Sequence, residues 1–223
     1  MQQAAALDST FAANRAAGRI ALSVAAAGEM TRRRHVYEDG PLRVRFPNSG
    51  EAGLEAVIVN TAGGIAGGDR HDLDIGVGDG ATLGVTTAAA DKIYRALGPD
   101  AEIAVKLSVG AQGLLAWLPQ ETILFDRARL RRRIEVDVAN AGSVLMAEAL
   151  VFGRSAMGET VKAGAFTDRW RVRRDGRLIF AETVRLDGEI ASLLAEPAVT
   201  AGVTRTSSTL RVKARAAPID SPR

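Results

Sequence analysis

Hydrophobic and polar residues alternate with a period of two along much of the chain. Val44 lies between Arg43 and Arg45, and the same alternation recurs over 103–109 and 134–138. A period of two indicates β-strands that bury one face and expose the other. Turn signals rich in glycine, aspartate and asparagine separate these segments at short, fairly even intervals, and such turns between alternating runs favour hairpins. The hairpin candidates include 78–80, 140–142 and 174–176.

We therefore predict a mainly β protein, with many short strands in stacked, solenoid-like or sandwich sheets. About two short helices are expected, one over 88–95 and one over 186–195, the latter stopped by Pro197. No linker interrupts the pattern, so residues 1–203 are expected to form a single β domain. From Thr204 the chain is polar and basic, and we expect 204–223 to be a disordered tail.

Two polar residues share an apolar strand face near the middle of the chain. Counting back by twos from Val77 through Ile75 and Leu73 places His71 and Asp69 on the apolar side. A core histidine with a hydrogen-bond partner would be the commoner explanation for His71 alone. Asp91 is a weaker candidate because the stretch around it is rich in alanine.

Two glutamates lie in the middle of other apolar rows. Glu148 belongs to the row over 144–152, and Glu182 belongs to the row over 178–186. A carboxylate in such a row is costly to bury unless it is paired, hydrogen-bonded, protonated or in contact with water. Pairing with arginines in the core is one explanation, and the candidates near in sequence are Arg154, Arg174, Arg177 and Arg185. Three apolar rows each contain a carboxylate. The alternative to separate ion pairs is therefore a polar interior shared by all three rows, such as a water-filled channel.

The segment 60–69 contains four glycines in six residues and ends in Asp69. Glycine reaches positive φ and allows close backbone approach, so this motif predicts a tight turn or a close crossing of two segments. A phosphate-binding loop would need Lys and Ser or Thr after the glycines, and the dinucleotide fingerprint is absent as well. The structural glycines are Gly63, Gly64, Gly67 and Gly68.

Composition narrows the class of function. Apolar residues make up 47% of the chain, which is enough for a core, and the net charge of +3 is too small to indicate nucleic-acid binding. The arginine-rich run 127–133 would place alternate arginines on one strand face, where contact with solvent is a simpler explanation than contact with phosphates or an acidic partner. No apolar run approaches the roughly 20 residues of a membrane span.

The inventory of reactive side chains is small. With no cysteine and two histidines, a Cys–His pair and a thiolate metal site are impossible, and a tight zinc site lacks ligands. The nucleophile motif Gly-x-Ser-x-Gly is absent too. A carboxylate pair for general acid–base catalysis stays open as an alternative, although no spacing in the sequence supports one. The absence of cysteine fits the reducing cytoplasm, where we expect the protein to reside.

Five blocks in a fixed order carry a resemblance to a known family. They are 60–69, 86–95, 117–126, 150–159 and 174–182. Over about 40–188 the chain resembles the UreD family, also called UreH, of urease accessory proteins. Family members continue beyond the end of this chain with further strands, and the segment after Thr204 does not follow the family pattern.

The resemblance implies a scaffold without enzymatic activity that binds apo-urease and UreF, and through UreF the GTPase UreG. It also implies that nickel released by UreG crosses the interior of the protein to the urease active site, with no tightly bound cofactor. The matching positions for this transient Ni2+ route are Asp69, Asp91, Glu148 and Glu182, and His71 is a further candidate that the resemblance does not single out. The alternative is a purely structural scaffold in which the buried carboxylates form core ion pairs.

Overall fold

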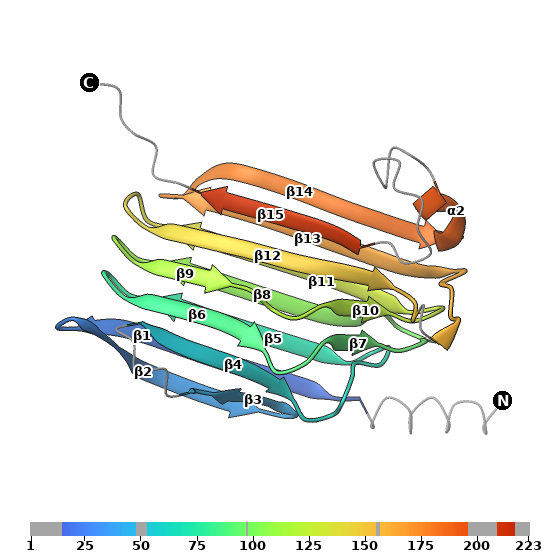
Figure 1. The fold of residues 1–223 in the computed structure, drawn as a ribbon, viewed down its shortest axis with the longest axis horizontal. Coiled ribbons are helices and arrows are strands. Elements are labelled where there is room, and N and C mark those ends of the chain that lie inside the picture. The colour runs from blue at the N-terminus through green and yellow to red at the C-terminus, as the bar shows by residue number, and fades with distance from the viewer. Residues whose placement is uncertain (1–14, 48–52, 97, 155–156, 196–208, 217–223) are drawn as a thin grey trace.

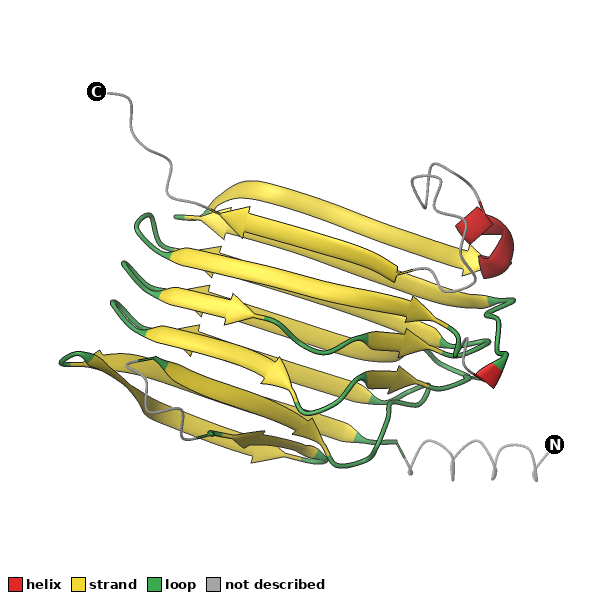
Figure 2. Ribbon diagram, viewed as in Figure 1, coloured by secondary structure: helices red, strands yellow, loops and turns green. Residues whose placement is uncertain are grey.

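Two β-sheets stacked face to face make up the structure, a computed structural model (Figures 1 and 2). It describes residues 15–47, 53–96, 98–154, 157–195 and 209–216, the last stretch by its backbone alone. The interior between the sheets holds the apolar core, because each strand turns alternate side chains inward. The prediction of a mainly β, solenoid-like protein is confirmed.

The first sheet, sheet A, contains seven strands in the order β14-β13-β11-β8-β5-β1-β2. Their bounds are β1 (Ala17–Ala27), β2 (Met30–Asp39), β5 (Arg70–Val77), β8 (Ala101–Val109), β11 (Arg129–Val138), β13 (Gly164–Arg174) and β14 (Arg177–Gly188). The five inner strands run parallel, and β2 and β14 pair antiparallel at the two edges. Sheet A therefore has a parallel centre with an antiparallel strand on each side.

The second sheet, sheet B, contains eight strands. Their bounds are β3 (Leu42–Arg45), β4 (Leu54–Asn60), β6 (Thr82–Thr87), β7 (Asp91–Ile93), β9 (Leu114–Trp117), β10 (Thr122–Leu124), β12 (Ser143–Phe152) and β15 (Thr209–Ala216). Strands β9 and β10 follow one another along β12, and both pair parallel with it. The antiparallel partners are β3, beside β4, and β15, beside β12.

From β4 to β13 the chain winds back and forth between the sheets. It leaves sheet B after β4, adds β5 to sheet A, returns to sheet B for β6 and β7, and repeats this through β8 to β13. The turns at 78–80 and 140–142 therefore join strands of different sheets, so the hairpin interpretation was wrong for them. A local turn signal shows that the chain reverses but not which strand it will pair with. The hairpin predicted at 174–176 does join β13 to β14.

Helix content is lower than the sequence suggested. In the part of the chain that the structure describes there is one α-helix, α2 (Ile190–Ala195), while 186–188 still belong to β14. The prediction of a helix over 88–95 was wrong, because Asp91–Ile93 forms strand β7 beside β10. Three residues are too few to show a strand period. Pro197 lies outside the described residues.

Aromatic side chains join the two sheets at the C-terminal end of the core. Phe166 on β13 packs edge-on against Phe152 on β12, with ring centroids 6.4 Å apart. Phe166 and Trp170 are each 1% exposed. Nearby, residues 209–216, which the sequence assigned to a disordered tail, form strand β15 along β12. The rest of 204–223 lies outside the described residues.

Candidate functional site

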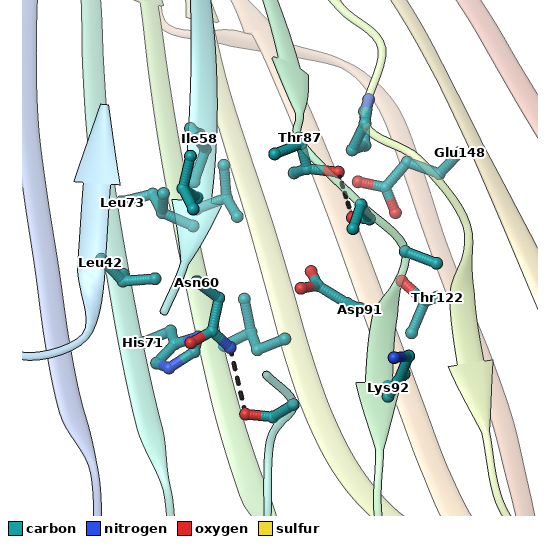
Figure 3. Close-up of a pocket in the computed structure, with 18 of the residues that line it drawn as sticks. Leu42, Ile58, Asn60, His71, Leu73, Thr87, Asp91, Lys92, Thr122 and Glu148 are labelled. Carbon is teal, nitrogen blue, oxygen red and sulfur yellow. Dashed lines mark hydrogen bonds between the residues drawn. The ribbon is translucent and has the colours of Figure 1, made fainter. Parts of the chain in front are cut away.

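A cavity of about 170 Å³ lies between the sheets (Figure 3). Aliphatic side chains such as Leu42, Ile58 and Leu73 form part of its wall. Its polar lining consists of Asn60, His71, Thr87, Asp91, Lys92, Thr122, Arg132 and Glu148. A single water needs roughly 10–15 Å³ measured in this way, so the cavity has room and polar partners for several. Because Lys92 and the neighbouring alanines at 88 and 89 are exposed, the cavity reaches the surface there.

Arg132 is part of the lining of this cavity and lies between two carboxylates. Its Nε donates to Oδ1 of Asp168 at 3.0 Å, and its Nη2 donates to Oδ2 of the same residue at 2.6 Å. On the other side, Nη1 forms an ion pair with Oε2 of Glu148. All three residues are at least nine-tenths buried. The two-pronged contact fixes the guanidinium plane against Asp168.

Each of the two carboxylates also accepts a hydrogen bond from an indole group. Nε1 of Trp117 donates to Oε1 of Glu148 at 2.8 Å, and Nε1 of Trp170 donates to Oδ2 of Asp168 at 3.0 Å. Glu148 thus pairs with Arg132 and not with the arginines near it in sequence. Each buried carboxylate has Arg132 as its cationic partner and one indole donor, which lowers the cost of burying its charge. Oε2 of Glu148, the oxygen that faces Nη1, accepts no hydrogen bond from the described residues.

Arg132 and Asp168 were missed by the sequence analysis, although the period of two would have found them. Arg132 lies between Leu130 and Ile134 on the inward face of β11, and Asp168 lies between Phe166 and Trp170 on that of β13. The exposed arginines beside Arg132 drew attention to the outer face of β11 instead. Counting inward positions on every strand, and not only on those with carboxylates, is the signal that finds both.

Asp91 places its carboxylate between His71 and Glu148 in the cavity (Figure 3). Burial raises the pKa of Asp91 to about 6, and the positive charge of Arg132 offsets part of this rise. Burial also raises the pKa of Glu148, against the opposing effects of Arg132 and Trp117. Three carboxylates, counting Asp168, face one guanidinium. The interior therefore carries an excess of negative charge when Asp91 is ionised.

The raised pKa of Asp91 makes stability depend on pH. Because folding favours the protonated carboxyl, its stabilising contribution is complete below the unfolded pKa of 3.8 and is lost as the pH rises through about 6. The free energy of unfolding of the native protein, relative to Asp91→Asn, should fall by about 3 kcal/mol across this range. Urea unfolding between pH 4 and 7 measures it. An exposed carboxylate on β5, Asp74, supplies the control Asp74→Asn; an Asp91→Asn difference as flat as that of the control would contradict the expectation.

His71 lies on β5 and is 4% exposed. Its Nε2 has no hydrogen-bond partner among the described residues. Burial lowers the pKa of His71, although the charges of Asp69 and Asp72 act in the opposite direction. A neutral imidazole has one unprotonated nitrogen, which can accept a hydrogen bond from water or bind a metal cation.

Asp69 is buried but does not line the cavity. Its Oδ1 accepts a hydrogen bond from the backbone N–H of Ala16 at 2.9 Å, and its Oδ2 accepts one from that of Ala66 at 2.8 Å. The carboxylate therefore connects the glycine-rich segment to the start of β1. The charged acceptor satisfies two partly buried backbone donors.

The glycines of this segment meet two different requirements. Gly63 and Gly68 have positive φ values of 75° and 87°, which other residues adopt only with strain. A Cβ at Gly67 would lie 2.6 Å from the carbonyl oxygen of Pro99, and one at Gly64 would clash with the ring of Tyr94. The motif thus brings 63–68 close against the segment that leads from β7 to β8.

Glu182 lies apart from the cavity, on the edge strand β14. It is half-buried and opposite Trp170 in the strand register, so it points toward the interior, as predicted. Its Oε2 has no hydrogen-bond partner among the described residues. Of the five candidates, the structure brings His71, Asp91 and Glu148 together around one cavity. It places Asp69 next to this group and Glu182 beyond Arg132 and Asp168.

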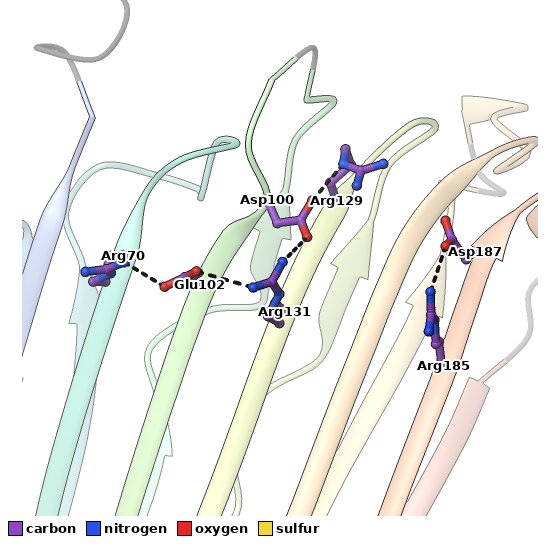
Figure 4. Close-up of polar contacts among 7 residues, drawn as sticks. All are labelled: Arg70, Asp100, Glu102, Arg129, Arg131, Arg185 and Asp187. Carbon is purple, nitrogen blue, oxygen red and sulfur yellow. Dashed lines mark hydrogen bonds and ion pairs between the residues drawn. The ribbon is translucent and has the colours of Figure 1, made fainter.

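The outer face of sheet A carries the arginine-rich run (Figure 4). Arg129 and Arg131 bind Asp100 at 2.7 and 3.1 Å, and Glu102 joins Arg131 to Arg70. These side chains face solvent in a network of mixed charge, as the simpler interpretation of the run expected. Arg127 was wrongly included in that strand face, because it precedes β11 and has a φ of 61°.

Among the described residues, no group of three or more His, Asp or Glu side chains is arranged so that it could hold a metal ion. Within the same residues, no helix has both the length and the apolar character needed to cross a membrane.

Comparison with known proteins gives one family. The family model described as UreD urease accessory protein matches residues 16–221. Urease accessory protein UreD of Rhodopseudomonas palustris strain HaA2 is 57% identical over 201 residues, covering 90% of this chain and 72% of the relative. Urease accessory protein UreD 3 of Bradyrhizobium sp. strain BTAi1 is 51% identical over 217 residues, covering 97% of this chain and 78% of the relative. The match extends beyond the blocks that carried the resemblance in the sequence.

Proposed function

The chain belongs to the UreD family of urease accessory proteins, and from this we propose that it delivers nickel to apo-urease through its interior. In this proposal it acts in the cytoplasm as a scaffold without catalytic activity, which fits the accessory role in the relatives' name. It binds apo-urease and UreF, and UreG joins through UreF. The supporting observation is the cavity between the sheets, where His71, Asp91 and Glu148 provide an imidazole and two carboxylates.

The imidazole and carboxylate groups that line the cavity are ligand types that bind nickel(II). Nickel(II) accepts imidazole nitrogen, carboxylate oxygen and water as ligands. The three side chains come from different strands, β5, β7 and β12, and are spread along the cavity (Figure 3). A cation held at each station by few protein ligands and several waters can enter and leave. Weak binding at several sites in a row is the condition for conduction through any selective passage.

A plain assembly scaffold is the second candidate, and the ion pairs around Arg132 favour it. Glu148 and Asp168 both contact this guanidinium, as core ion pairs would. If these carboxylates only stabilise the fold, changing them would weaken folding or partner binding. Asp91 separates the two candidates best, because it forms no ion pair with any other described residue and its carboxylate faces the cavity.

The test is the nickel content of urease matured with variants of this chain. We expect Asp91→Asn to slow nickel loading by roughly tenfold, the lower end of what losing a group near a metal costs. The chain is co-expressed with urease and its accessory proteins, and nickel per urease active site is measured by mass spectrometry over time. Asp74→Asn, which changes an exposed carboxylate on the outer face of sheet A, is the matched control.

A pull-down with urease and UreF shows whether assembly survives in each variant. Slow loading with intact assembly supports the interior route. Normal loading by the double variant Asp91→Asn/Glu148→Gln would exclude that route. Loss of assembly in Asp91→Asn, with Asp74→Asn unaffected, would favour the plain scaffold.

A further inference from the structure

Arg132 separates two groups of polar side chains in the interior. On its cavity side lie His71, Asp91 and Glu148. On its other side lies Asp168, which is not part of the cavity wall, and across the next strand pair lies Glu182, opposite Trp170. In the strand order β11-β13-β14, the guanidinium therefore lies between the cavity and the strand that carries Glu182.

The guanidinium occupies the place that a divalent cation would favour. Its nitrogens contact oxygens of both Glu148 and Asp168, so these two carboxylates lie on opposite sides of one positive charge. Asp91 is near enough for its charge to act on Arg132 as well. Without the arginine, Glu148 and Asp168 would face each other across a buried space with no positive charge between them. Two carboxylates that face one buried space attract a hard or borderline divalent cation.

Stability alone does not explain an arginine at this position. A buried ion pair contributes little net stability, because removing the charges from water costs about as much as their attraction returns. Apolar side chains of similar volume at such positions are often as stable or more stable. Position 132 is flanked on the inward face by Leu130 and Ile134, where an aliphatic residue would continue the row. We therefore infer that the positive charge of Arg132 has a role besides packing.

We propose that Arg132 is a built-in counter-cation that prevents the interior from retaining a divalent cation. The proposal rests on the proposed function and deepens it. While the guanidinium neutralises Glu148 and Asp168, an arriving cation meets only Asp91, His71 and the half-satisfied Glu148. It is bound weakly and must displace Nη1 of Arg132 to gain a further carboxylate. Arg132 thus acts as a positioning residue: it holds Glu148 and Asp168 so that they do not bind the divalent cation tightly and keep it in the interior.

The test measures Ni2+ binding to the full chain by calorimetry at neutral pH, without urease present. An opposite charge within about 4–6 Å shifts a carboxylate's proton affinity by one to three powers of ten, so removing it should act similarly on a cation. We expect Arg132→Met to bind Ni2+ about 10- to 100-fold more tightly than the native chain. Arg132→Lys keeps the positive charge and should bind at nearly the native strength.

Two further variants protect the test against misfolding and against nonspecific gains. Arg132→Gln is also neutral but can still donate to one carboxylate, and it replaces Arg132→Met if thermal unfolding shows that the latter does not fold. The double variant Arg132→Met/Asp168→Asn removes one charge of each sign, so its affinity should return toward the native value. Nickel loading of urease should be slower with the neutral single variants than with Arg132→Lys.

Each result decides the proposal. A folded neutral variant that binds Ni2+ no more tightly than the native chain would overturn it. So would tight binding that persists in the double variant, or tight binding with unchanged loading of urease. Failure of the proposed function is recognised separately, as normal loading by Asp91→Asn/Glu148→Gln, whatever the affinity of the Arg132 variants.

Discussion

Replacing Asp168 by alanine is expected to lower the free energy of unfolding by about 3–5 kcal/mol, because it leaves a buried guanidinium without its main partner. Nε and Nη2 of Arg132 would both lose their acceptors, and Nε1 of Trp170 would lose one too. Arg132 is 5% exposed, so water reaches it poorly. Urea unfolding followed by tryptophan fluorescence measures the effect.

The matched control is the exposed network on the outer face of sheet A. Glu102 contacts Arg70 and Arg131, but its side chain is 41% exposed. Glu102→Ala should change the free energy of unfolding by no more than about 1 kcal/mol, because solvent screens such pairs. If Asp168→Ala cost as little as this control, water entering from the cavity would be solvating the guanidinium.

Replacing Phe166 by alanine should cost about 3–5 kcal/mol of stability, the range found for removing a large aromatic side chain from a core. Phe166 on β13 is 1% exposed and packs edge-on against Phe152 on β12. This contact joins sheet A to sheet B. The variant loses the transfer free energy of the ring and leaves a void that the stacked sheets cannot readily close. The shift of the urea midpoint, with the slope unchanged, measures the loss.

Leu178 provides the comparison for Phe166, since it lies on the neighbouring strand β14 and is 49% exposed. Leu178→Ala should stay within about 0.5 kcal/mol of the native chain. Phe166→Leu should fall between the two alanine variants, because it keeps part of the buried volume. Equal effects of Phe166→Ala and Leu178→Ala would show that the two sheets are not closely packed at this end.

The sequence was most informative where a property belongs to one strand. The period of two correctly placed Asp69, His71 and Glu148 among buried side chains, since alternation is fixed by the geometry of a single extended segment. It also pointed to the inward orientation of Glu182. It failed for the three-residue strand β7, which is too short for any period, so the position of Asp91 at the cavity was visible only in the fold.

Contacts between strands were beyond the reach of the sequence. The partner of Glu148 proved to be Arg132, and the second partner of that arginine is Asp168, 36 residues farther along the chain. Nothing local to any of these residues indicates the others. They meet because successive turns of the solenoid stack β11 beside β13, and because the two sheets face each other across the core.

The amino-acid sequence by itself determined the strand class, the inward-facing side chains and the membership of the family. The tertiary structure alone decided which turns cross between sheets, which carboxylates line the cavity and which are held by Arg132 or by backbone amides. The physical reason is the separation along the chain over which each property is set. Side-chain direction along a strand follows from covalent geometry, whereas the meeting of charged groups depends on how whole apolar faces are buried against one another.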